Sequence, residues 1–181
     1  MTEIAQTRIK ADQFLQLPET NVPTELIDGE VIMAPSPTVN HQRFVSRIER
    51  TIARLATTGE VFFAPLDVYL DEDNVVQPDV LWVGPESACT VGEDYLQGPP
   101  DLIVEVLSAG TARRDRREKF ALYEQHGVRE YWMIDPEAEF VEVWQLKDRR
   151  FDRLGVFGPG EAFVSAALGG KTVDLSLIFE R

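Results

Sequence analysis

The most constraining feature of this sequence is the run Asp-Leu-Ile-Val-Glu-Val-Leu at residues 101–107, which is apolar except for the charges of Asp101 and Glu105. A nearly continuous apolar run is typical of a strand that is buried on both faces of a sheet. A charged helical pattern at residues 111–126, ended by Gly127, follows it, and residues 130–134 predict a further strand. Strand, helix and strand in this order predict a βαβ unit with two parallel strands and a right-handed crossover.

Shorter patterns predict the remaining elements. Two helices are expected, a short one at residues 11–17 that ends before Pro18 and an amphipathic one at residues 39–56. Hairpins are expected around Asp28-Gly29 (residues 25–34) and between residues 140–146 and 151–156, with two weaker strands in residues 162–179. Residues 61–70 and 75–83 predict two more strands, the second interrupted by Pro78, which is typical of an edge, a bulge or a strand start.

These patterns predict an α/β (α+β) protein with a mixed central β-sheet, flanking helices and an additional C-terminal β hairpin region. At 181 residues the chain has the length of one ordinary domain, and no linker divides it. We therefore expect a single domain over residues 1–181, with a core at about residues 20–136 and a β-rich extension at 137–181.

Charge and cysteine content narrow the class of protein. The chain has 18 Lys and Arg against 31 Asp and Glu, a net charge of −13, which excludes a protein that coats nucleic acid by bulk charge. Half of the cations lie in two predicted helices, four at residues 43–54 and five at residues 113–119, so local basic faces remain. The single Cys89 forms no intrachain disulfide, and no run is apolar enough for a membrane span, so a cytoplasmic protein without a membrane partner is expected.

Three side chains carry the chemical signal. Glu105 lies within an apolar strand, so its carboxylate needs a cation, a hydrogen-bond donor or a proton to offset the cost of its desolvation. The same holds for Asp79, which follows Pro78 within a predicted strand. If their strands are neighbours, both carboxylates can reach one divalent ion, and oxygen ligands suit Mg²⁺. Lys119 shares a helical face with Leu122 and Tyr123, so it lies along the packed side and needs an anion.

Structural roles for the same residues stay open at this point. Asp79 can be a turn residue, Glu105 can form a structural ion pair with an arginine, and the stem of Lys119 can cover apolar surface. The arginines of residues 43–54 can form a solvated face that pairs with nearby acids.

The order of several short motifs resembles a known family. Gln77-Pro78-Asp79 followed by residues 101–106 resembles the Pro-Asp … (Asp/Glu)-X-Lys signature of the restriction-endonuclease-like phosphodiesterases. The longer pattern resembles the Uma-two family of small endonucleases, and it comprises Asp28-Gly29-Glu30, His41, Glu105-Val-Leu-Ser108, Asp115, Lys119, Tyr123, Gly127, Glu130-Tyr131-Trp132 and Asp135-Pro136. One position departs from the superfamily signature, because Leu107 stands where its lysine would be.

The resemblance implies a restriction-endonuclease-like fold and a Mg²⁺-dependent endonuclease that cleaves DNA, with Mn²⁺ as a substitute. It implies that Asp79 and Glu105 hold the metal, that Lys119 replaces the missing strand lysine, and that Glu30 is an additional acidic member of the site. His41 is left out of the metal set, and Tyr123 is expected to line the site. A homodimer is expected because a double-strand cut needs two sites. Two other functions remain, a catalytically silent nucleic-acid-binding or protein-interaction module and a metal-dependent hydrolase of small phosphorylated molecules.

Overall fold

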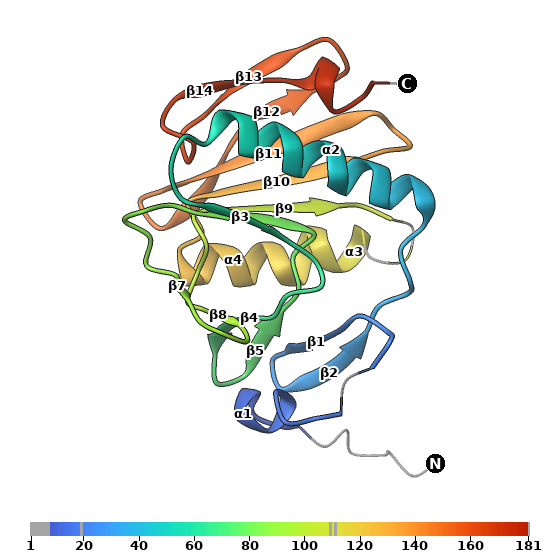
Figure 1. Cartoon of the computed structure of the whole chain (residues 1–181), viewed down its shortest axis with the longest axis vertical. Helices are drawn as coiled ribbons and strands as arrows, with labels where there is room; N and C mark the ends of the chain where they lie inside the picture. The colour runs from blue at the N-terminus through green and yellow to red at the C-terminus, as the bar shows by residue number, and fades with distance from the viewer. Residues whose placement is uncertain (1–7, 19, 109, 111, 181) are drawn as a thin grey trace.

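A computed structural model of the chain describes residues 8–18, 20–108, 110 and 112–180 (Figure 1). Its helical elements are α1 (Ala11–Phe14), α2 (Val39–Leu55), α3 (Ala112–Arg114), the π-helical turn η1 (Asp115–Lys119), α4 (Phe120–His126) and the 3₁₀ turn η2 (Leu175–Leu177). Its strands are β1 (Thr24–Ile27), β2 (Glu30–Met33), β3 (Glu60–Phe63), β4 (Val68–Asp71), β5 (Asn74–Val76), β6 (Val80–Val83), β7 (Thr90–Val91), β8 (Leu96–Gln97), β9 (Leu102–Val106), β10 (Glu130–Asp135), β11 (Phe140–Lys147), β12 (Arg150–Phe157), β13 (Ala162–Ser165) and β14 (Lys171–Asp174).

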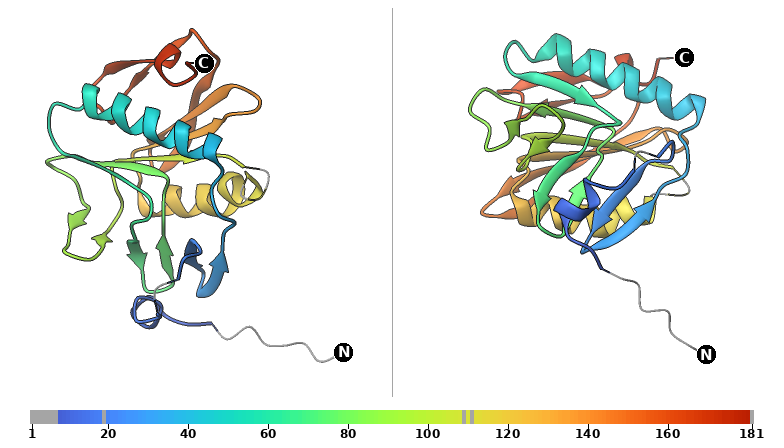
Figure 2. Two further views of the ribbon diagram at one scale, coloured as in Figure 1. Left: turned by 45° about the vertical axis from the view of Figure 1, so that its right-hand side comes forward. Right: turned by 60° about the horizontal axis from the view of Figure 1, so that its bottom comes forward.

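The main sheet has the strand order β12-β11-β10-β9-β6-β3. β9 and β10 are parallel and every other neighbouring pair is antiparallel, so the predicted βαβ unit is confirmed as β9, the α3–η1–α4 helix and β10. Leu102, Val104 and Val106 of β9 pack in the core on the α2 side. Ile103 packs with Leu122 and Tyr123 of α4, so the two helices cover opposite faces of the sheet, as the left view of Figure 2 shows.

The second sheet has the order β2-β1-β5-β4-β8-β7. The hairpin predicted around Asp28-Gly29 is confirmed as the antiparallel pair β1–β2, with Ile27 opposite Glu30. β1 pairs on its other side with β5 through Leu26 and Val75, which brings the N-terminal hairpin against the middle of the chain. The second sheet therefore lies beside the main sheet at the end where β5 passes into β6.

The prediction of one continuous strand at residues 61–70 and another at residues 75–83 is wrong. Each is split in two, and its halves belong to different sheets: β3 and β6 pair in the main sheet, whereas β4 and β5 pair in the second sheet. Pro65 and Pro78 lie in the gaps, where the chain leaves one ladder for the other, because proline has no N–H to donate to a ladder. Residues Gln77–Asp79 are thus the crossover between the sheets.

The helix predicted at residues 111–126 has an irregular middle. Thr111 lies outside the described residues; from Ala112 onward an α-helical turn leads into the π-helical turn η1 and then α4, which ends at Gly127. Single π-helical turns inside α-helices occur frequently at functional sites. This one turns the buried side chains of Asp115 and Lys119 toward the sheet.

The C-terminal region is β-rich, as expected. β13 and β14 form an antiparallel hairpin, and its residues Phe163 and Val173 join the core on the α2 side of the main sheet. The α+β class with a mixed central sheet, flanking helices and a C-terminal hairpin is therefore confirmed. Among the described residues, no helix is both long and apolar enough to cross a membrane.

Candidate active site

Asp79, Glu105 and Lys119 come together at the edge where the two sheets meet. Glu105 points from β9 toward the helix, where Lys119 Nζ lies 2.9 Å from its Oε1 and Tyr123 Oη donates to the same oxygen at 2.7 Å. Asp79 stands immediately before β6, the strand beside β9, and its Oδ2 accepts a hydrogen bond of 2.7 Å from the backbone N–H of Val106. The neighbouring strands expected for the two carboxylates are thus present.

Two further carboxylates belong to this cluster. Glu25 of β1 places its Oε1 2.8 Å from Lys119 Nζ and also accepts a hydrogen bond of 2.8 Å from the N–H of Gln77. Asp115 lies one helical turn before Lys119, with Oδ1 at 3.7 Å from the ammonium. Sequence reasoning missed Glu25 as a site residue, although it shares a strand face with Ile27, a core residue, and that alternation is a signal for an inward carboxylate.

Glu30 is not brought into this cluster. It lies on the edge strand β2 with its side chain 39% exposed, and it forms an ion pair with Arg8 at 3.8 Å. The hairpin therefore does contribute an acidic residue to the cluster, but from β1, five positions before the one that the resemblance indicates.

Burial and unequal charge define the electrostatics of the cluster. Burial raises the pKa of Glu105, which lies well above its usual range; Lys119 opposes this rise, whereas Asp115, Asp79 and Glu25 add to it. Burial lowers the pKa of Lys119, but the charges of Glu105, Glu25 and Asp115 outweigh it, so the pKa of this ammonium lies well above its usual value. Lys119 is therefore a permanent cation that lies among several carboxyl groups.

His41 lies where the cluster meets solvent. It belongs to the first turn of α2, and its Nε2 is 3.2 Å from Asp79 Oδ2. The side chains of His41 and Asp79 are 14% and 17% exposed, whereas those of Lys119 and Glu105 are 6% and 4% exposed. Burial lowers the pKa of His41, but the hydrogen bond and charge of Asp79 outweigh it and raise the pKa overall. Among these four side chains, the cluster is therefore most accessible to solvent at Asp79 and His41, beside the start of α2.

The donor set fits a hard divalent cation in its chemistry. Carboxylate oxygens are the ligands that Mg²⁺ and Mn²⁺ prefer, and Glu25, Asp79, Glu105 and Asp115 outnumber the one lysine among them. In the part of the chain that the structure describes, however, no three His, Cys, Asp or Glu side chains converge as a ready ion site. The point of convergence of Glu25 and Glu105 is the ammonium of Lys119.

Comparison with known proteins gives the same family as the sequence motifs. A protein of Synechocystis sp. with the description "uncharacterized" is 29% identical over 158 residues, 83% of this chain and 89% of that protein. The crystal structure of a "putative nuclease belonging to DUF820" from Anabaena variabilis superposes with a TM-score of 0.77 at 23% identity, covering 94% of this chain and 97% of that one, which shows the shared fold. The family model named Uma2, described as "Putative restriction endonuclease", matches residues 11–176. The resemblance to the Uma-two family is thus confirmed, and the chain belongs to the Uma2 family.

Proposed function

We propose that this protein is a Mg²⁺-dependent endonuclease that hydrolyses phosphodiester bonds in DNA. The observation that carries the proposal is the ammonium of Lys119 held at 2.8 and 2.9 Å from Glu25 and Glu105, with Asp79 anchored on the backbone of the strand that carries Glu105. This arrangement supplies carboxylates that can bind a metal ion and an ammonium group that can contact an anionic substrate. The family description "Putative restriction endonuclease" supports it.

Asp79 and Glu105 are the proposed metal ligands. When bound, Mg²⁺ polarises a phosphodiester and makes a water molecule a stronger nucleophile, and Mn²⁺ supplies the same chemistry. Asp79 is oriented by the Val106 N–H and by His41, and Glu105 by Tyr123. Such hydrogen bonds fix the direction in which a carboxylate presents its oxygens.

Lys119 is proposed to stabilise negative charge on the reacting phosphate. Its raised pKa keeps the side chain protonated at neutral pH, which suits a hydrogen-bond donor and excludes a general base. The π-helical turn places it opposite Glu105, and this offers a structural reason why the lysine can come from the helix although Leu107 occupies the strand position. A preorganised donor of this kind contributes roughly 3–4 kcal/mol of transition-state stabilisation.

The central experiment is cleavage of plasmid and oligonucleotide DNA by the purified protein in Mg²⁺ or Mn²⁺. We expect Asp79→Asn and Glu105→Gln to lower the rate by at least about 100-fold. Glu142→Gln is the control, because Glu142 is also a buried carboxylate, paired with Arg116 and Arg153 outside the cluster. Cleavage that survives both site substitutions would place the activity elsewhere, and no cleavage of any nucleic acid would favour the silent module or a hydrolase of small phosphorylated molecules.

A second pair of variants decides which residue of the N-terminal hairpin takes part. We propose that Glu25, which contacts Lys119, has the role that the resemblance gives to Glu30. Glu25→Gln is expected to lower the cleavage rate by at least about tenfold, and Glu30→Gln by less than about threefold. The reverse ranking would return the role to Glu30.

One observation favours the silent module as a second candidate. Lys119 pairs closely with both Glu25 and Glu105, so the cluster is held together by its own lysine. If the cluster has only this structural role, Mg²⁺ will neither stabilise the protein nor support cleavage.

We also propose a single domain over residues 1–181 that acts as a homodimer in the cytoplasm. The dimer would supply two sites for a double-strand cut. The one cysteine, Cys89, is a buried free thiol, which suits a reducing compartment. Sedimentation of the purified protein tests the dimer.

A further inference from the structure

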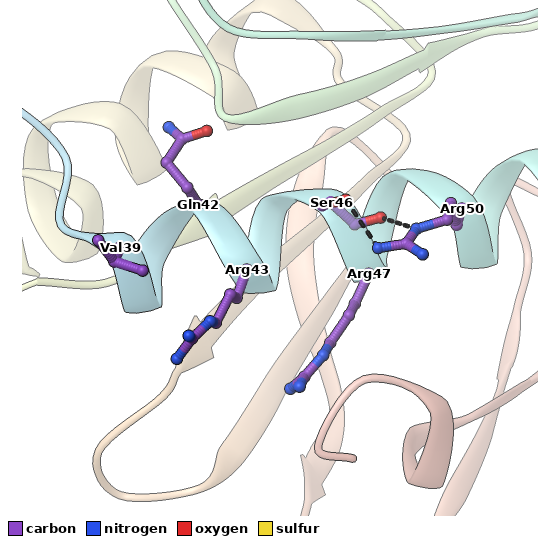
Figure 3. A pocket seen from close by; sticks show the side chains of 6 residues that line it. All are labelled: Val39, Gln42, Arg43, Ser46, Arg47 and Arg50. Atoms are coloured by element: carbon purple, nitrogen blue, oxygen red, sulfur yellow. Dashed lines mark hydrogen bonds between the residues drawn. The ribbon is translucent and has the colours of Figure 1, made fainter. Parts of the chain in front are cut away.

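The outward face of α2 presents a set of arginines that have no acidic partner among the described residues. Arg43, Arg47 and Arg50 line an open hollow of about 400 Å³ together with Val39, Gln42 and Ser46 (Figure 3). Across the described part of the chain, no carboxylate lies within ion-pair distance of these guanidinium groups, whereas Arg116, Arg129, Arg150 and Arg153 each have one. Among the described residues, these three arginines therefore do not form the ion pairs with nearby acids that the structural interpretation of this face requires.

Neutral groups hold two of these arginines in place. Arg50 donates from its guanidinium to the backbone oxygen of Ser46 at 3.0 Å and to Ser46 Oγ at 2.9 Å, contacts drawn as dashed lines in Figure 3. Arg47 donates to the backbone oxygen of Ile178 at 3.3 Å and lies over the ring of Phe44. These partners order the side chains without cancelling their charge, so less side-chain entropy remains to be lost on binding an anion.

The spacing of the arginines suits a periodic polyanion. Arg43 and Arg50 are seven residues apart on one helix, about 10 Å along its axis. One strand of DNA has a phosphate for every ~3.4 Å of axis, so this separation matches about three nucleotide steps. In a protein of net charge −13, a local face of this kind attracts phosphates at short range, within a screening length of about 8 Å.

The face lies on the same helix as His41 but on its other side. Arg43 and Arg50 follow His41 by two and nine residues, which turns them roughly 180–200° away around the helix. His41 contacts Asp79 where the cluster opens to solvent. A substrate at Asp79 would therefore reach the arginines only across the width of the helix, about 10–12 Å, or at least three base steps from the scissile bond.

We propose that the Arg43–Arg47–Arg50 face of α2 binds the phosphate backbone of duplex DNA several nucleotides away from the bond that is cut. The proposal rests on the proposed function in taking DNA as the substrate. It assigns α2 two tasks on opposite sides, with His41 orienting Asp79 on one side and the arginines holding the flanking duplex on the other.

Binding without cleavage tests the proposal. Fluorescence anisotropy of a labelled duplex about 20 base pairs long, in EDTA and from about 50 to 200 mM salt, measures the dissociation constant of the full chain. Arg43→Gln/Arg50→Gln is expected to weaken binding and to lower the slope of log Kd against log salt by about 1.8. The ratio of the variant's Kd to the wild-type Kd should therefore fall about tenfold as the salt concentration rises across this range. Lys147→Gln/Arg149→Gln, which removes two charges from the β11–β12 turn, should change both quantities less.

Equal effects of the two double variants, or no effect of either, would overturn the proposal, because net charge alone would then explain binding. Loss of binding to polyglutamate with unchanged DNA binding would assign the face to an acidic protein and would also overturn it. Thermal melts of each variant test whether the fold is retained.

Cleavage separates this proposal from the proposed function. In Mg²⁺, the arginine variant should lose rate on the long duplex and keep the wild-type rate on one that ends within about three base pairs of the cut. If binding depends on the arginines but no DNA is cleaved, the proposed endonuclease activity is wrong and the DNA-binding surface is supported. If DNA is cleaved but binding does not depend on the arginines, the endonuclease activity is supported and the DNA-binding surface is wrong.

Discussion

Lys119 is the residue on which the buried cluster depends electrostatically. Its ammonium lies 2.8 Å from Glu25 and 2.9 Å from Glu105, and all three side chains are almost fully buried. Removing one member of a buried pair leaves uncompensated charge and costs roughly 3–5 kcal/mol. We expect Lys119→Met to lower the free energy of unfolding by this amount in urea titrations monitored by circular dichroism.

Lys147→Met provides the comparison for that prediction. Lys147 also forms an ion pair, at 2.9 Å with Asp152, but both side chains are mostly exposed, and such pairs contribute about 0–1 kcal/mol. If the two substitutions cost the same, the cluster is screened by solvent and the electrostatic description given above is wrong.

At the scale of the elements, the connection from α2 to β3 depends on Gly59. Its φ is +78°, and a Cβ there would collide with the backbone oxygen of Val83 and approach Trp82 Nε1 to 2.9 Å. Gly127, which ends α4, has a φ of +87° but no heavy atom within 4 Å of a Cβ. Gly127→Ala should therefore cost about 1–2 kcal/mol for the backbone conformation alone, and Gly59→Ala at least about 1 kcal/mol more for the collision. Thermal melts of the two variants measure the difference, and equal losses would contradict the steric explanation.

The elements that sequence predicts well here are those with a local period. α2, the β1–β2 hairpin and the β9–helix–β10 unit follow from apolar spacing and from turn residues, which act over a few positions. The division of residues 61–70 and 75–83 between two sheets does not follow from such spacing. Pro78 indicates an interruption, but only tertiary pairing decides which sheet each half joins.

The candidate site divides in the same way. Glu105 and Asp79 are recognisable because a charge stands beside apolar residues, and Lys119 because it lies on the apolar face of a predicted helix. The structure brings all three together. Glu25 escapes notice because it stands in a strand of only four residues, and its partner Lys119 is distant in sequence. The π-helical turn likewise escapes prediction, since no residue type in 115–119 indicates it.

At the scale of the whole molecule, the excess of carboxyl groups over lysine in the cluster predicts that divalent cations stabilise the fold. A ligand that binds only the native state stabilises it by about 2.7 kcal/mol at 100 times its dissociation constant. We expect the melting temperature to rise with MgCl₂ relative to NaCl of equal ionic strength, and this rise to disappear in Asp79→Asn. A rise that persists in that variant would indicate binding elsewhere, and no rise in the wild type would favour the silent module.

The crossover at Gln77–Asp79 also bears on when the protein acquires its site during synthesis. The cluster joins Glu25 from the second sheet, Asp79 from the crossover, Glu105 from the main sheet and Lys119 from the helix that follows. A nascent chain that ends before Lys119 carries the carboxylates without the ammonium between them, and their mutual repulsion opposes docking of the second sheet against the main sheet. The two sheets are therefore expected to pack together only after the α3–η1–α4 helix has left the ribosome. Until then the partly synthesised protein has no assembled site.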